Sequence, residues 1–222
     1  MPAKHTVKIY VENGFYHLFN RGVEKRPIFL DRNDYVAFLS ILKRYLTNPD
    51  DLSSGYLDFS HGVPSRRSDL HTKIQLVSYC LMPNHFHILV KQLTKNAITE
   101  FTRRVGDAYV RYFNDRYERV GGLFQGKIKG ILIDNDAYLL HLTRYIHRNA
   151  EEFWDRSLRE YPYSSYPEYL GLRNTAWMHP EEILAYFRSP LNAYRKGYFS
   201  YENFIETPKE DSGDILKELT LE

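Results

Sequence analysis

Alternating apolar and polar positions predict β-strands in four segments of the chain. Asn13-Gly14, a dipeptide typical of tight hairpin turns, separates the first two segments. Met82-Pro83-Asn84 separates the last two, because proline cannot donate to a central ladder of hydrogen bonds. The predicted strands span residues 8–11, 15–20, 74–80 and 85–90.

Apolar residues that recur every three or four positions predict helices in three longer segments. Asp31 or Asn33 can cap the first helix and Asn135 opens the third, because short polar side chains satisfy the free N–H groups of a helix start. The predicted helices span residues 34–46, 96–117 and 135–149. This order of elements indicates an α+β protein whose helices pack on an antiparallel sheet.

The segments between and after these elements lack a clear period. Residues 48–70 combine Pro, Gly and Ser and are predicted to form a loop or an insertion. Residues 123–133 are rich in Gly and Lys and fit a strand or a loop, and two short helices are predicted near 180–187 and 190–196. The expected parts are a main domain over residues 1–172 and a small helical extension over residues 173–222.

Composition excludes several classes of protein. The 222 residues are 43% hydrophobic and 26% charged, which suffices for a buried core. Nothing approaches the ~18 consecutive apolar residues of a membrane span, and residues 1–5 begin no apolar block typical of a signal peptide. Cys80 is the single cysteine, which excludes an internal disulfide and a cysteine-rich zinc cage. We expect a soluble, intracellular protein with no membrane partner.

Charge is unevenly distributed, although the net charge is only +2. Residues 91–130 hold nine basic and four acidic side chains, a local charge of +5, whereas residues 205–222 hold two basic and six acidic ones, a local charge of −4. A basic middle suggests a surface for a polyanion. The 19 tyrosines suit base stacking in such a surface, and they suit ordinary half-buried packing about equally well.

Two pairs of residues are candidates for chemistry. His85 and His87 project from the same face of a strand, where two imidazoles can share one divalent cation; paired histidines without a metal are the alternative. Tyr145 and Asn149 lie four residues apart and share a helix face. A tyrosine hydroxyl can act as a nucleophile and an amide oxygen can complete a metal shell, yet most helical tyrosines only pack. Tyr145 and Asn149 are functional candidates only if a metal site lies beside them.

Two longer motifs occur around these pairs, Met-Pro-Asn-His-Phe-His at 82–87 and Arg-Tyr-Ile-His-Arg-Asn at 144–149. Shorter ones lie at 15–22, 122–127 and 163–166. In this order they resemble single-tyrosine HUH transposases, the IS200-like group that includes REP-associated tyrosine transposases. HUH denotes two histidines separated by a bulky hydrophobic residue. The resemblance extends over roughly residues 8–172.

The resemblance implies a ferredoxin-like sheet and an enzyme that cuts single-stranded DNA beside a hairpin, with Mg²⁺ or Mn²⁺ as cofactor. By position, His85, His87 and Asn149 are the implied metal ligands. Tyr145 is the implied nucleophile, which forms a 5′-phosphotyrosine and leaves a free 3′-OH for rejoining. Ala150 departs from the family pattern, because many relatives have proline there. Such a protein is expected at the nucleoid of a prokaryotic cytoplasm.

The sequence leaves several points of this function open. A hairpin-binding regulator that does not cut and a hydrolase that uses water are the alternatives, and Tyr145 could serve its own chain or a partner in a homodimer. No general base is identified; His141 and His147 are expected to be surface residues. Expected DNA-binding residues are Arg21, Arg26, Arg103, Arg104, Arg111, Phe124, Lys127 and Lys129.

Overall fold

Four antiparallel strands form one sheet in the order β2-β3-β1-β4. The structure, a computed structural model, describes residues 10–52, 69–188 and 198–207. The strands are β1 (Gly14–Arg21), β2 (Ile74–Met82), β3 (His85–Gln92) and β4 (Lys129–Ile133). With one helix after β1 and another after β3, this is the ferredoxin-like arrangement, and the predicted fold class is confirmed.

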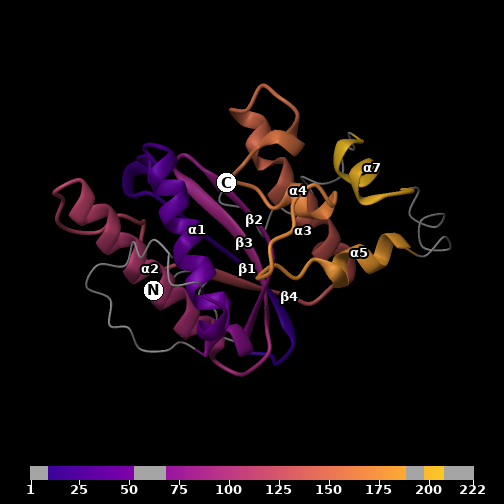
Figure 1. Cartoon of the computed structure of the whole chain (residues 1–222), viewed down its shortest axis with the longest axis horizontal. Coiled ribbons are helices and arrows are strands. Elements are labelled where there is room, and N and C mark those ends of the chain that lie inside the picture. Colours follow the sequence, from indigo (N-terminus) through magenta and orange to yellow (C-terminus); the bar gives the residue numbers. More distant parts are fainter. Residues whose placement is uncertain (1–9, 53–68, 189–197, 208–222) are drawn as a thin grey trace.

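Helices cover both faces of the sheet, with α1 and α2 on one side and the others opposite (Figure 1). The helices are α1 (Arg32–Leu46), α2 (Ala97–Arg116), α3 (Asp136–Arg148), α4 (Tyr166–Tyr169), α5 (Glu181–Arg188) and α7 (Tyr201–Glu206). Short 3₁₀ turns lie at Val23–Lys25, Pro49–Asp51, Leu70–Thr72, Asn149–Glu152 and Leu158–Glu160. No helix within the described ranges is both long and apolar enough to cross a membrane.

The period of two along β3 divides its side chains between two hydrophobic cores. Phe86 and Ile88 enter the core beneath α1 and α2. Leu89 enters the second core, to which α3 contributes Leu142 and Ile146. The histidines of β3 share the side of Leu89, so the same alternation that fills the first core presents them to α3.

Helix starts follow the predicted capping residues. The Asp31 carboxylate accepts hydrogen bonds from the backbone N–H groups of Asn33 and Asp34, so Asp31 caps α1. The Asn135 amide oxygen accepts from Ala137 and Tyr138 at the start of α3. The three long helices and the strands at 15–20, 74–80 and 85–90 are confirmed, and β4 forms within the segment 123–133.

The prediction of a strand over residues 8–11 is wrong for residues 10 and 11, the two that the structure describes. Tyr10 and Val11 precede β1 outside any strand, and residues 8 and 9 lie outside the described ranges. The turn itself forms, since Gly14 donates its N–H to the Val11 carbonyl at 3.1 Å and Asn13 has a φ of 60°. A hairpin cannot follow, because β3 and β4 already occupy both edges of β1.

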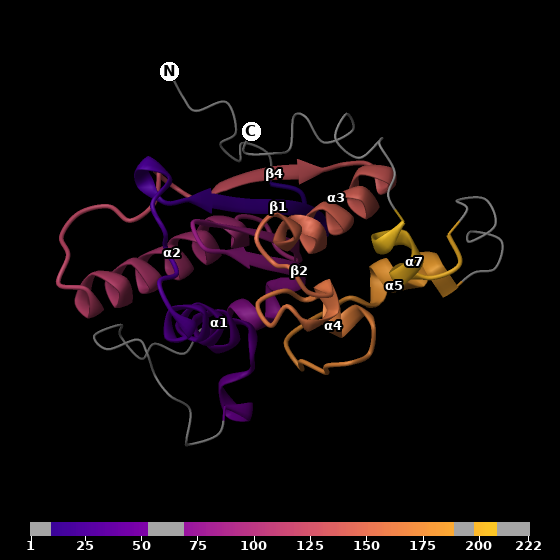
Figure 2. The ribbon, with the colours of Figure 1, turned by 90° about the horizontal axis from the view of Figure 1, so that it is seen from above.

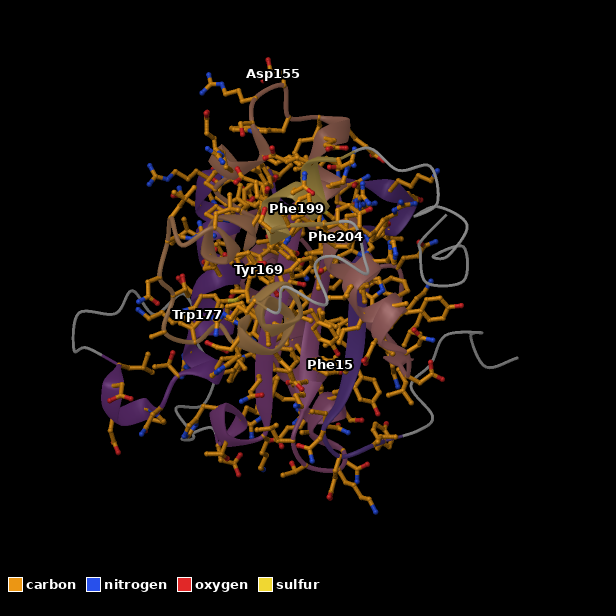
Figure 3. The ribbon with its side chains drawn as sticks, turned by 90° about the vertical axis from the view of Figure 1, so that its right-hand side faces the viewer. Phe15, Asp155, Tyr169, Trp177, Phe199 and Phe204 are labelled. Carbon is orange, nitrogen blue, oxygen red and sulfur yellow. The ribbon has the colours of Figure 1, made fainter. Side chains whose placement is uncertain are left out.

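The segment 198–207 packs against α3, and Figure 2 shows α5 and α7 beside this helix. Tyr201 and Phe204 are buried in the second core, and Phe204 and Tyr169 lie within the crowded side-chain layer of Figure 3. The helix near 180–187 is confirmed as α5, and α4 and α7 were not predicted. The helix at 190–196 and most of the loop at 48–70 fall outside the described residues, and the boundary at residue 172 stays a prediction.

Candidate active site

His85 and His87 lie at the edge of the sheet where β1 ends and β3 begins. Pairing places Arg21 opposite His85 and Phe19 opposite His87, so these four side chains share one face. The two imidazole rings are 5.2 Å apart between centroids and nearly perpendicular. His87 is fully buried and His85 is 9% exposed. The spacing of two residues therefore brings both rings to one place, as predicted.

The Asn84 amide fixes which nitrogen of His85 is available. Its Nδ2 donates to the Lys25 carbonyl, which turns Oδ1 toward His85 Nδ1 at 2.6 Å. Because an amide oxygen can only accept, the proton of the neutral ring lies on Nδ1. The lone pair of His85 Nε2 then faces away from Asn84 and into the site.

Asn149 is turned toward the same point by the helix that carries it. Its Nδ2 donates to the Tyr145 carbonyl at 3.0 Å, one helical turn earlier, and its Oδ1 lies 3.4 Å from His85 Nε2. Two acceptors thus face each other without a proton between them. A cation between them would satisfy both lone pairs.

His87 contributes a third atom that lacks a protein partner. Its Nδ1 lies 2.7 Å from His17 Nε2, on the neighbouring strand, and the two rings stack with centroids 4.9 Å apart. Its Nε2 is buried and has no hydrogen-bond partner among the described residues. A buried nitrogen in this state is the kind of atom that a metal ligand presents.

Burial keeps both imidazoles neutral near pH 7. Desolvation lowers the pKa of His85 to about 4, and the nearby positive charge of Arg21 acts in the same direction. Desolvation also lowers the pKa of His87 far below its ordinary value, helped by His17 and His85. Only a neutral imidazole has a lone pair for a metal, so the environment selects the form that can act as ligand.

Tyr145 lies on the face of α3 that covers the histidines. Buried Leu142 and Ile146 hold this helix against the sheet, and its capped start at Asn135 fixes where it begins. The half-buried Tyr145 ring contacts His87 edge-on, with centroids 5.1 Å apart. The site therefore combines the hydroxyl of one helix with the imidazoles of one strand, all from a single chain.

The donor set fits a divalent cation. The available donors are His85 Nε2, His87 Nε2 and the amide oxygen of Asn149. Within the described ranges, no cluster of three His, Cys, Asp or Glu side chains could hold a metal without such an amide oxygen. Two imidazole nitrogens and one neutral oxygen leave room for water or phosphate oxygens. Mixed nitrogen and oxygen donors suit Mn²⁺, while Mg²⁺ prefers oxygen.

Comparisons with known proteins found a family model and a solved structure that match this chain. Residues 66–149, from before β2 to the end of α3, match the family model described as transposase IS200 like. The resemblance to IS200-like transposases is confirmed. A solved structure of a REP-associated tyrosine transposase bound to a REP hairpin aligns with a TM-score of 0.51 and 12% identity, over 79% of this chain and 97% of that one. At this identity the likeness shows the fold. No curated protein matches the chain.

Three of the predicted DNA-binding residues lie beside this candidate site. Arg21 ends β1 opposite His85, and its guanidinium is close enough to act on the pKa of both histidines. Lys129 begins β4 and holds its Nζ 5.7 Å from the Phe19 ring centre. Lys127 is exposed just before it. Together they form a basic edge, defined here as Arg21, Lys127 and Lys129.

The other predicted DNA-binding residues are placed differently. Arg103 and Arg104 lie in the first half of α2, which starts beside Gln92 at the far end of β3, and each pairs with an acid on its own helix. Phe124 packs its ring on Phe86 and Tyr109 in the first core. Arg26 pairs with Glu24, and Arg111 is exposed on α2. The structure does not bring Arg103 or Arg104 to the histidines.

Three residues near the site have contacts that the sequence did not predict. His17 contacts His87, and Asn84 contacts His85. The signal for His17 was its place in the motif at 15–22, two positions before Phe19 and therefore on the same face of the strand. The expectation that His147 is a surface residue is wrong. It is fully buried, with Nε2 2.8 Å from Ser165 Oγ and Nδ1 2.7 Å from Tyr201 OH. With both nitrogens engaged, it is not placed to act as a base for Tyr145.

Proposed function

We propose that this protein is a metal-dependent endonuclease and strand transferase that acts on single-stranded DNA at hairpin-flanked sites. The observation that carries the proposal is a cluster of four side chains: the His85 and His87 rings lie 5.2 Å apart, the Asn149 oxygen lies beside His85 Nε2, and the Tyr145 ring rests against His87. The family match supports a transposase, which acts on DNA. The residues of this one chain supply both a donor set for a cation and a nucleophile.

The chemistry follows from the residue types. The Tyr145 oxygen attacks the phosphorus of a DNA phosphodiester and gives up its proton, the bond from phosphorus to the 3′ oxygen breaks, and that oxygen takes up a proton. The product is a 5′-phosphotyrosine and a free 3′-OH, which conserves the bond for rejoining. A cation held by His85, His87 and Asn149 would draw charge from a non-bridging phosphate oxygen and assist the leaving oxygen.

The position of Tyr145 suits attack by a side chain that is held in place. Its ring rests against His87, and the helix that carries it is fixed at both ends, by the Asn135 cap and by Asn149. A positioned nucleophile converts a bimolecular encounter into a unimolecular step. Free tyrosine has a pKa of ~10, so loss of its proton costs ~4 kcal/mol at pH 7, which the site must offset.

DNA would approach over the basic edge. Arg21, Lys127 and Lys129 offer positive charge at the end of the sheet where the histidines lie. The similar solved structure holds a REP hairpin, which supports a hairpin as the substrate of this chain. Binding through phosphates predicts an affinity that falls steeply with salt.

Two other functions compete with this proposal. A regulator that binds hairpins without cutting would need the basic edge but neither Tyr145 nor a metal. A hydrolase that activates water would need the metal site but not the Tyr145 hydroxyl. The edge-on packing of Tyr145 against a candidate ligand favours the transferase over both.

The deciding experiment looks for a covalent protein–DNA adduct. Labelled hairpin oligonucleotides from the repeats that flank the native gene are incubated with the full chain and Mg²⁺ or Mn²⁺, then separated on a denaturing gel. We expect an adduct that EDTA prevents and that Tyr145→Phe abolishes. Tyr138→Phe is the matched control, because Tyr138 lies on the same helix and is exposed.

Each alternative gives a different gel. Cleavage without adduct that persists in Tyr145→Phe would establish the hydrolase. Binding without cleavage of any repeat, with either metal, would establish the regulator. An adduct that also forms in Tyr145→Phe would assign the nucleophile to another side chain.

A further inference from the structure

The inference concerns His17, a buried residue of β1 that lies outside the proposed donor set. Its ring is fully buried between Phe19, 4.7 Å away between ring centroids, and His87, 4.9 Å away. Its Nε2 lies 2.7 Å from Nδ1 of His87. Burying an imidazole in this place costs solvation, so the contact that it makes is informative.

One proton lies between the two rings. If His87 donates from Nδ1 to His17 Nε2, then the neutral His87 ring has a lone pair on Nε2, which can bind a cation. If His17 donates instead, the proton of His87 lies on Nε2, where it blocks a cation and has no acceptor among the described residues. Only the first arrangement leaves His87 able to bind the cation of the proposed function. The tautomers of the two rings are therefore coupled.

The two histidines of the donor set are held in parallel ways. Asn84 Oδ1 accepts at Nδ1 of His85, and His17 Nε2 occupies the equivalent place at Nδ1 of His87. Metal-bound histidines commonly donate their second ring N–H to such a partner, and loss of the partner typically weakens metal binding 10–100-fold.

Resting on the function proposed above, we infer that His17 is a positioning residue. It accepts the Nδ1 proton of His87 and so holds that ring as the tautomer, and in the orientation, that presents Nε2 to a divalent cation. His17 contacts neither DNA nor the cation in this role; it acts through His87 alone.

The test measures Mn²⁺ affinity directly, without DNA or turnover. Free Mn²⁺ is quantified by its EPR signal during titration of the full chain and of three variants. His17→Leu removes the acceptor, and we expect binding at least tenfold weaker. His17→Gln places an amide oxygen near the position of Nε2, and we expect affinity within about threefold of the unaltered protein. Leu18→Val is the control, because Leu18 is the next residue of β1 and enters the opposite core.

The outcomes separate this inference from the proposed function. If the unaltered protein binds no Mn²⁺, the metal dependence proposed above fails and this inference fails with it. If it binds Mn²⁺ and His17→Leu binds as tightly, only this inference fails. Equal weakening in Leu18→Val would assign the effect to a general loss of stability and would also overturn it.

A spectroscopic measurement covers the case in which His17→Leu does not fold. Long-range ¹H–¹⁵N correlation spectra of the unaltered protein distinguish the two tautomers of each histidine ring. We expect the His87 ring to carry its proton on Nδ1. A spectrum with that proton on Nε2, both before and after addition of the diamagnetic ion Mg²⁺, would overturn the inference.

Discussion

The two faces of the sheet differ in what they bury. Beneath α1 and α2, β3 contributes Phe86, Ile88 and Val90 to a core built of apolar side chains. Beneath α3, the same strand contributes His85 and His87, whose polar atoms need partners. Both faces exclude water, and on the second the buried Nε2 of His87 has no hydrogen-bond partner among the described residues. The first face therefore serves packing, while the second combines a hydrophobic core with polar side chains placed for a ligand.

The difference indicates on which face a residue can be changed for function with little loss of stability. Phe86 meets Phe38 and Phe124 through ring contacts, so the first face is stabilised by many interchangeable van der Waals contacts. Around the histidines, the second face depends on single polar contacts, each with one geometry. Substitutions on the first face should change stability, and substitutions on the second should change chemistry.

The largest effect is expected from mixing two inactive variants. Tyr145→Phe lacks the nucleophile, and the double variant His85→Ala/His87→Ala lacks the imidazoles. Since Tyr145 packs on His87 of its own chain, we expect the mixture to form no adduct, an all-or-none result on the denaturing gel. A dimer that exchanges α3 between chains would restore adduct in the mixture. That outcome would show that the α3 face is completed by a second copy.

A large effect on stability is expected from the first face. Phe86→Ala removes a fully buried ring and should lower the free energy of unfolding by about 3–5 kcal/mol, measured by urea denaturation. Tyr145→Phe removes only one hydroxyl and should change it by less than about 1.5 kcal/mol. Equal losses in the two variants would break the contrast between the faces.

Acid should destabilise the protein through His147, a buried histidine of the second face. Burial lowers the pKa of His147 to about 3, below the usual value near 6.5, so the unfolded chain binds a proton as the pH falls through 6.5 and the folded chain does not. Acidification therefore favours the unfolded chain, and the free energy of unfolding should fall by about 2 kcal/mol between pH 7 and pH 5. His147→Gln should show a correspondingly smaller loss in denaturation curves recorded in EDTA. The same slope in both proteins would mean that His147 does not titrate in this way.

The sequence predicts the two faces unequally well. The periods of two and of three or four identify β3, α2 and α3, because amphipathic order in sequence directly reflects which side is buried. The site is predicted in part: His85 and His87 follow from one strand, and Tyr145 with Asn149 from one helix. Which strands lie side by side is not encoded in any local pattern.

For that reason the sequence does not predict contacts between residues of different strands. His17 and His87 are separated by 70 positions, and they meet only because β1 lies next to β3 in the sheet. The burial of His147 likewise depends on Ser165 and Tyr201, which reach it from distant segments. The basic residues of α2 illustrate the opposite error, in which charge in sequence suggests a shared surface that the fold does not form.

The smallest expected effect is a change in hairpin affinity, which distinguishes the basic edge from the basic residues of α2. Arg103 is exposed, pairs loosely with Asp107 at 3.8 Å and lies away from the histidines. Arg103→Ala should change hairpin affinity less than twofold and the free energy of unfolding by less than about 0.5 kcal/mol. Arg21→Ala removes a charge beside His85 and should weaken hairpin binding several-fold, with a slope against salt concentration reduced by about one. Fluorescence anisotropy at several salt concentrations measures both. Equal losses in the two variants would extend the DNA path over α2, and a helix that covers the first face would then also contact the substrate.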